Sequence, residues 1–379
     1  MDNAATSWPK PPQVIQAMAS FLKDAGGNPG RSGHRLSIEA GRLLFEARYA
    51  LAGFFNVPEP MRVVFTQNAT HAINIALWGL LKEGDRVVTT SIEHNSVMRP
   101  LRTLEKLGVE VVTVQCGPDA SLDPDDMARA LEEGARLVII NHASNVTGTI
   151  LPVKEVSHIA HEAGALLMVD AAQTAGCLPI DVQNDGIDLL AFTGHKSLLG
   201  PTGTGGLVIC DSVPLSDFKP LTQGGTGSNS EYEEQPEDLP DKFESGTPNA
   251  VGFAGLQASL DFVTDKGILN IREHERRLTR FLLDGLQDIP GVTLYGPDDT
   301  SKRTAIVPFT VEGFRVSEIG YRLDEEFDVL SRVGLHCAPS LHKTIGTFPE
   351  GTVRLSPGDY SDEDDIDKVL NAIKTIVAQ

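Results

Sequence analysis

Between about residue 60 and residue 210, short apolar runs alternate with longer amphipathic stretches, and this alternation limits the possible folds more than any other feature. The apolar runs show no polar alternation, which is typical of strands buried on both faces of a sheet. The stretches between them have helical periodicity. We therefore predict an α/β fold around a mostly parallel sheet. The predicted strands are Arg62–Phe65, Arg86–Thr90, Val109–Val114, Leu137–Ile140, Leu166–Val169, Ile187–Phe192 and Gly206–Ile209, and the helices between them are Thr70–Leu81, Val97–Leu107, Asp123–Glu132 and Val153–Glu162.

The pattern changes after about residue 215. The polar, acidic segment Gly224–Asp241 predicts a long loop or a short hairpin. One long helix is expected from Val251 into the 280s, with alternating charges on a solvated face. From about Gly291 onward, short strands and helices indicate a second, smaller α+β domain.

Composition excludes several classes of protein. The 379 residues carry a formal net charge of −20, which argues against binding to nucleic acid or to an anionic membrane. No apolar run approaches the roughly 18 residues of a membrane span, and no signal peptide is recognisable. The four cysteines are scattered without a C-x-x-C pair, so neither a disulfide framework nor a zinc site is expected. Cytoplasm is the expected compartment.

Polar residues follow five of the predicted strands. Ligands of parallel α/β sheets bind at the carboxyl ends of the strands, so these residues are expected to share one crevice. Taken alone, each has an ordinary structural explanation: Asp170 or Asn145 could cap a turn or helix, and His94 could be a loop histidine. Their joint arrangement is less easily explained by structure alone. The residues are Asn68, Ala69 and Thr70 after the first strand, then His94, Asn145, Asp170 with Gln173, and Thr193 with His195 and Lys196.

Lys196 lies in "TGHKSLLGPTGTGG", among small and apolar residues where an ammonium group loses its hydration. Pyridoxal phosphate accounts for it, because the aldehyde of this cofactor needs a lysine amine to form a Schiff base. The cofactor also needs a carboxylate at its pyridine nitrogen, a helix N-terminus at its phosphate and an aromatic ring on one face. Asp170, the Asn68–Thr70 turn and His94 would supply these groups. No metal site is expected, since His158 and His161 have no third ligand nearby.

At this point a family resemblance is evident. The chain resembles the class V aminotransferase superfamily of fold-type I pyridoxal-phosphate enzymes, and within it the cysteine desulfurases. The motifs that carry the resemblance are "DNAATS", "SNVTGT", "VDAAQ", "TGHKSLLGPTGTGG", "ESGTPN", "RVGLHCAP" and "VRLSPGDY". The SufS-type branch, with selenocysteine lyase, is the most similar. The resemblance implies a large domain at 14–250 with a seven-stranded sheet, and a small domain formed by 1–13 and 251–379.

The resemblance also implies roles for residues around the cofactor. Lys196 would carry the cofactor, Asp170 would pair with the pyridine nitrogen, and Gln173 would hydrogen-bond the phenolic oxygen. His94 would stack on the ring and take part in proton transfer. The other expected cofactor contacts are Asn145, Ala69, Thr70, Thr193 and His195, together with Thr247 from the partner subunit of a homodimer.

Substrate binding and sulfur transfer are expected from the C-terminal part. By resemblance, Arg354 would bind the carboxylate of L-cysteine, with Asn145 and Arg332 as further candidates. Cys337 would accept the sulfur as a persulfide. Its polar setting, "GLHCAPSLHK", favours an exposed reactive thiol over a buried structural one. By contrast, Cys116, Cys177 and Cys210 lie in or beside apolar runs and are expected in the core.

Three departures from the family pattern are evident. The phosphate turn has Ala69 before Thr70, where two threonines are common, His71 follows where a glutamate is usual, and Leu335 replaces a common histidine. The predicted function is conversion of L-cysteine to L-alanine, with a sulfur-acceptor protein as partner and a role such as iron–sulfur cluster assembly. The alternatives are selenocysteine lyase, a cysteine C–S lyase, another class V reaction, or a silent scaffold.

Overall fold

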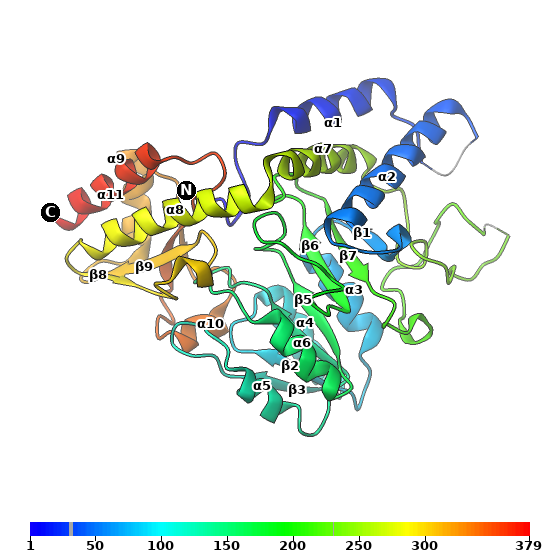
Figure 1. Ribbon diagram of the computed structural model, residues 1–379, viewed down its shortest axis with the longest axis horizontal. Helices are drawn as coiled ribbons and strands as arrows, with labels where there is room; N and C mark the ends of the chain where they lie inside the picture. Colours follow the sequence, from blue (N-terminus) through cyan, green and yellow to red (C-terminus); the bar gives the residue numbers. More distant parts are fainter. Residues whose placement is uncertain (30–32, 230) are drawn as a thin grey trace.

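The computed structural model describes residues 1–29, 33–229 and 231–379 (Figure 1). A seven-stranded sheet has the order β1-β7-β6-β5-β4-β2-β3. All neighbouring pairs among β2 to β6 are parallel, while β7 is antiparallel to both of its neighbours, β1 and β6. The predicted mostly parallel sheet is confirmed. Its strands are β1 Val63–Thr66, β2 Arg86–Thr90, β3 Glu110–Val114, β4 Leu137–Asn141, β5 Leu166–Asp170, β6 Leu189–Thr193 and β7 Gly205–Ile209.

Helices cover both faces of this sheet, which explains why its strands are apolar throughout. Along β4, Leu137 and Ile139 pack on one face with α3 and α4, while Val138 and Ile140 pack on the other with α2, α5, α6 and α7. The helices of this layer are α1 Pro12–Asp24, α2 Arg35–Phe54, α3 Ala69–Leu80, α4 Asn95–Glu105, α5 Pro124–Ala130, α6 Val153–Glu162 and α7 Ala250–Lys266. Within the described ranges, no helix is long and apolar enough to cross a membrane.

The C-terminal part forms a second, antiparallel sheet with the order β10-β11-β9-β8. Apolar side chains of α8, α9 and α11 pack on it in a core of their own. The predicted smaller α+β unit is therefore confirmed (Figure 1). Its elements are α8 Ile268–Gln287, β8 Val292–Leu294, β9 Val307–Val311, α9 Val316–Phe327, β10 Arg332–Gly334, α10 Pro339–Thr344, β11 Thr352–Leu355 and α11 Glu363–Val377; short 3₁₀ turns lie at Pro60–Arg62, Leu215–Asp217 and Thr300–Lys302.

The prediction of one long helix after Val251 is wrong. Two helices, α7 and α8, meet at Gly267, whose φ of 84° is in the left-handed region that a glycine adopts without strain. Phe253 and Leu256 of α7 pack in the core of the first sheet, whereas Leu282 of α8 packs in the core of the second. The domain boundary at 250/251 stays a prediction, and this packing favours moving it to Gly267.

The polar segment Gly224–Asp241 forms no helix or strand in its described residues, so the loop alternative holds there and the hairpin does not. Ser230, within this segment, lies outside the described residues.

Candidate active site

A cavity opens at the carboxyl edge of the large sheet. Because β2, β4, β5 and β6 run parallel, and β1 and β6 are both antiparallel to β7, the carboxyl ends of these five strands lie on the same edge. The expected crevice is therefore found. Its lining residues are Asn68, Ala69, Thr70, His94, Ser96, Asn141, Ala143, Asn145, Asp170, Ala172, Gln173, Thr193, His195 and Lys196.

Lys196 and Asp170 are the charged pair of this cavity. Asp170 is the last residue of β5, buried, and its Oδ1 accepts a hydrogen bond of 2.9 Å from the backbone N–H of Ala172. Burial raises the pKa of Asp170, and the nearby charge of Lys196 lowers it. Burial lowers the pKa of Lys196 to about 8, despite the opposing charge of Asp170. A larger fraction of this amine is thus unprotonated, and nucleophilic, at neutral pH than for an ordinary lysine.

His94 is the N-cap of α4, and its ring is oriented by the start of that helix. Its Nδ1 accepts a hydrogen bond of 3.0 Å from the backbone N–H of Ser96 and lies 2.8 Å from the Ser96 hydroxyl. Burial, and then the charges of Lys196 and Arg332, lower the pKa of His94 to about 4. The ring is therefore neutral at pH 7, with its proton on Nε2.

The turn before α3 has the geometry of an anion site. Asn68 caps the helix by accepting from the backbone N–H of His71 at 2.9 Å, and the first N–H groups of a helix have no intrahelical partner. Gly205 allows β7 to approach this turn, since a Cβ there would lie 2.8 Å from the Cα of Asn68. The glycines of "TGTGG" thus serve close packing beside the turn.

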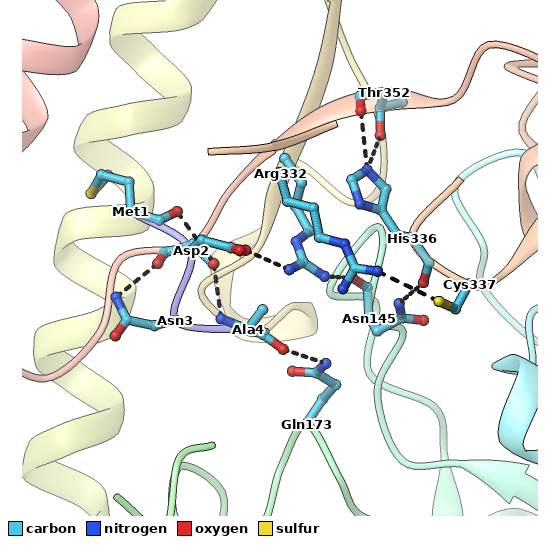
Figure 2. A network of polar contacts seen from close by, with 12 residues as sticks. Met1, Asp2, Asn3, Ala4, Asn145, Gln173, Arg332, His336, Cys337 and Thr352 are labelled. Atoms are coloured by element: carbon cyan, nitrogen blue, oxygen red, sulfur yellow. Dashed lines mark hydrogen bonds and ion pairs between the residues drawn. The ribbon is translucent and has the colours of Figure 1, made fainter. Parts of the chain in front are cut away.

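Asn145 connects the cavity to the small sheet. Its Nδ2 donates to the backbone carbonyl of His336 at 2.7 Å (Figure 2). The backbone carbonyl of Asn145 accepts from Arg354 Nη1 at 2.9 Å. Arg354 is fully buried, and burial lowers its pKa. Arg354 Nη2 also donates to Asp2 Oδ1 at 2.7 Å. Arg332, Arg354 and Cys337 do not line the cavity itself but lie next to it through Asn145.

Cys337 is exposed and rigidly held. His336 and Cys337 have φ values of 46° and 61°, which is rare for residues other than glycine. The carbonyl of Cys337 accepts from the backbone N–H of Asn95 at 2.8 Å, which ties the loop to the start of α4. Arg332 Nη2 lies 3.5 Å from Cys337 Sγ, so a cation faces the sulfur (Figure 2).

The other cysteines agree in part with the prediction that they are core residues. Cys177 is buried, but Cys116 and Cys210 are only partly buried. Burial raises the pKa of the Cys116 and Cys210 thiols to about 12, so these thiols are not reactive at neutral pH.

Thr247 is the one predicted cofactor residue that does not line this cavity among the residues described. It is an exposed residue. A role for it within a single chain is therefore not supported by the geometry.

Several residues at the site were not predicted from the sequence. Asn141 ends β4 and lines the cavity with a buried Oδ1 that has no partner in the described residues. Glu93 lies behind it, fully buried, and burial raises its pKa to about 8. Ser96 could have been found from its spacing after His94, since Ser at this position often supports a helix start. Asp2 begins the motif "DNAATS", but nothing local identifies its partner, which is more than 350 residues away.

The residues present fit pyridoxal phosphate. The cavity combines an amine of lowered pKa, a buried carboxylate at the end of a strand, a neutral imidazole and a helix start. Buried polar atoms without partners in the described residues, namely Asn145 Oδ1 and His195 Nδ1, remain for a polar ligand.

The family model for class V aminotransferases matches residues 1–369. A "Probable cysteine desulfurase" from Methanothermobacter thermautotrophicus is 38% identical over 99% of this chain and 94% of that protein. The chain belongs to the cysteine desulfurase family of class V aminotransferases. The predicted family and enzyme class are therefore confirmed, and the family implies pyridoxal phosphate as cofactor.

Solved structures of cysteine desulfurases have the same fold. The apo enzyme from Thermococcus onnurineus NA1 superposes with a TM-score of 0.93 at 33% identity, covering 100% of this chain and 94% of that one. CsdA from Escherichia coli, in an S-sulfonic acid form, superposes with a TM-score of 0.88 at 29% identity, covering 100% and 94%. The predicted fold-type I architecture is confirmed.

Proposed function

We propose that this cysteine desulfurase converts L-cysteine to L-alanine and transfers the sulfur to Cys337. The observation that carries the proposal is the position of an exposed thiol beside Arg332 and next to a cavity that contains a lysine amine of lowered pKa. The nucleophilic form of a cysteine is its thiolate, and the Arg332 guanidinium lies against this sulfur.

Pyridoxal phosphate, when bound, supplies an aldehyde for amine capture and a ring that accepts electrons. Lys196 would hold it through its amine, and Asp170 would face the ring nitrogen. His94 would stack on the ring, Gln173 would contact the phenolic oxygen, and Asn145 would lie beside it. The phosphate would be held by Ala69, Thr70, Thr193 and His195.

The substrate carboxylate would bind to Arg354, with Arg332 and Asn145 beside it. A buried guanidinium presents several N–H donors in a fixed plane, which suits a carboxylate. Arg354 Nε is buried and has no partner in the part of the chain that the structure describes, so it remains available for this ligand.

In the sulfur step, Cys337 Sγ as thiolate would attack the sulfur of the substrate. An S–S bond forms and the C–S bond breaks, and its electron pair stays on the carbon. A proton from Lys196 or His94 completes the methyl group of alanine, leaving a persulfide on Cys337. A thiol reductant or an acceptor protein would then remove the sulfur.

We further propose a homodimer in which Thr247 of the partner subunit reaches the phosphate. Large apolar side chains are exposed on α1 and α2, two helices that both pack against α7, and we take this side of the molecule as the interface. They include Ile15, Leu22, Ile38, Phe45 and Tyr49. The SufS-type branch, a sulfur-acceptor protein, a role in iron–sulfur cluster assembly and a cytoplasmic location are proposals that rest on the motifs of the sequence.

Product analysis with L-cysteine tests the function. Wild-type enzyme with a thiol reductant should form alanine and sulfide in equal amounts and no pyruvate. Cys337→Ala should still change the cofactor absorption on addition of cysteine, but should release no alanine. Cys210→Ser is the matched control, since this partly buried thiol lies at the opposite end of the sheet, and it should behave as wild type.

Other outcomes would point to the alternatives. Pyruvate as the main product would favour a C–S lyase. Alanine formation by Cys337→Ala at the wild-type rate would exclude Cys337 as the acceptor, and turnover of selenocysteine alone would favour selenocysteine lyase.

A further inference from the structure

The buried guanidinium of Arg354 already has a carboxylate partner within the chain. Arg354 Nη2 donates to Asp2 Oδ1 at 2.7 Å, and the side chains are 1% and 29% exposed. The two residues are separated by more than 350 positions. The contact is therefore made by the tertiary fold and has no counterpart in local sequence.

Asp2 is fixed opposite Arg354 by backbone pairing. Asp2 forms a parallel β-bridge with Ser356, which lies two residues after Arg354 on the continuation of β11. The N–H of Asn3 donates to the Ser356 carbonyl at 3.1 Å, and the N–H of Ser356 donates to the Met1 carbonyl at 2.8 Å. Asp2 is thus a fixed counter-ion, held in register with the arginine.

Arg332 has no carboxylate partner among the residues that the structure describes, and its Nη2 faces Cys337 Sγ. The neighbouring His336 adds no charge, because burial and the charge of Arg354 lower its pKa to about 2. Of the two guanidinium groups, only that of Arg354 is paired with a carboxylate. Arg332, Arg354 and Asp2 together carry about one net positive charge, which one substrate carboxylate balances.

We propose that Asp2 is a positioning residue that sets the charge selectivity of the substrate site. By neutralising one of the two arginines and fixing its plane, it matches the site to amino acids with a single carboxylate. Once one substrate carboxylate is bound, a second anionic group on the substrate would find no uncompensated positive charge beside the two arginines. This inference rests on the proposed role of Arg354 in carboxylate binding.

Binding of two ligands to the holoenzyme tests the proposal. L-alanine carries one carboxylate, and L-aspartate carries a second one where cysteine has its thiol. Titration calorimetry should show that Asp2→Asn shifts the ratio of the two dissociation constants toward aspartate by about ten-fold or more. Asp2→Glu, which keeps the charge, should restore most of the wild-type ratio.

Asp188→Asn is the matched control, because Asp188 is a buried carboxylate just before β6, at the edge of the sheet opposite the cavity. It should leave the ratio unchanged. A shift below two-fold in Asp2→Asn, or an equal shift in Asp188→Asn, would overturn the proposal. If Asp2→Asn does not fold, Asp2→Ser is judged by the same thresholds.

Arg354→Ala, titrated in parallel, distinguishes failure of the proposed role of Arg354 from failure of the proposed role of Asp2. If it leaves alanine binding unchanged, the proposed role of Arg354 fails. If it weakens alanine binding while the ratio in Asp2→Asn stays constant, only the inference about Asp2 fails.

Discussion

The two sides of the active site are built in different ways. On the large-domain side, Asp170 and Lys196 are 26 residues apart and come from adjacent strand ends, so their meeting follows from the parallel order of β5 and β6. On the small-domain side, Arg354 meets Asp2 and Asn145 across more than 200 residues each. On the large-domain side, the order of the strands brings the reactive side chains together. On the small-domain side, the contacts of Arg354 depend on how three distant segments of the chain pack.

The two sides also differ in charge. The large-domain side holds buried acids, Asp170 and Glu93, whose pKa values are raised by burial. The small-domain side holds Arg332 and Arg354, whose charges contribute to lowering the pKa of His94 and of Lys196. The cavity between them therefore keeps the imidazole of His94 neutral and brings the pKa of the Lys196 amine close to neutral pH, by combining burial with nearby cations.

The largest effect is expected on the large-domain side, at Lys196. Lys196→Ala removes the only group proposed to capture the cofactor aldehyde, and should reduce turnover by on the order of 10³-fold or more. Lys196→Arg should fail equally, since a guanidinium cannot provide a free amine. Activity assays and the visible absorption of the purified protein measure the loss. Near-wild-type desulfuration by Lys196→Ala would refute the cofactor assignment.

On the small-domain side, Arg354→Ala should act on substrate affinity. Loss of a charged hydrogen-bond partner costs about 1.5–3 kcal/mol, which corresponds to a roughly ten- to hundred-fold weaker apparent affinity for cysteine. The absorption of the bound cofactor should not change. Unchanged affinity, measured from initial rates, would transfer the carboxylate role to Arg332.

A smaller, several-fold effect on reaction rate should separate the two opposing influences on the pKa of Lys196, which are burial and the charge of Asp170. In the apoprotein, the rate of reaction between this amine and pyridoxal phosphate should rise with pH up to about 8, following the lowered pKa. Asp170→Asn removes the charge that raises this pKa, so the initial rate at pH 7 should increase. A rate that keeps rising to pH 10, as for an ordinary lysine, would contradict the contribution of burial.

The smallest effect concerns stability and Glu93. Its pKa is raised to about 8 by burial, so the folded state holds a proton that the unfolded state loses above about pH 4.5. The contribution of Glu93 to stability should therefore fall as the pH rises from about 4.5 to about 8, and Glu93→Gln should lack this contribution.

Thermal unfolding should detect this difference. The melting temperatures of wild type and Glu93→Gln should agree near pH 4 and differ by roughly 2–4 °C above pH 8, with the variant more stable. Glu105→Gln, at an exposed carboxylate on α4, is the control and should show no such divergence. Equal melting temperatures of wild type and Glu93→Gln at pH 9 would contradict this prediction, because ionisation of Glu93 would then not destabilise the folded state.

The limits of sequence prediction follow the same division of the molecule. The strands and helices from β1 to β7 were predicted within a few residues, because the pattern of apolar residues in each segment indicates which of its faces are buried. The single helix after Val251 was wrong, since helical periodicity continues through Gly267 although the chain turns there. Local patterns also fail to show how deeply a single residue is buried, as for the partly buried Cys116 and Cys210. Nor do they show whether Thr247 lies near the cavity, because both properties depend on tertiary packing.

By itself, the sequence determined the parallel sheet, the polar strand ends and the motif residues of the cavity, from Asn68 to Lys196. Only the tertiary structure decided that Asp2 neutralises Arg354, that Arg332 faces Cys337 and that Asn145 joins the two sides. The reason is physical. Periodicity encodes which face of an element is buried, but the charge balance of a site depends on which distant groups come within a few ångströms of each other.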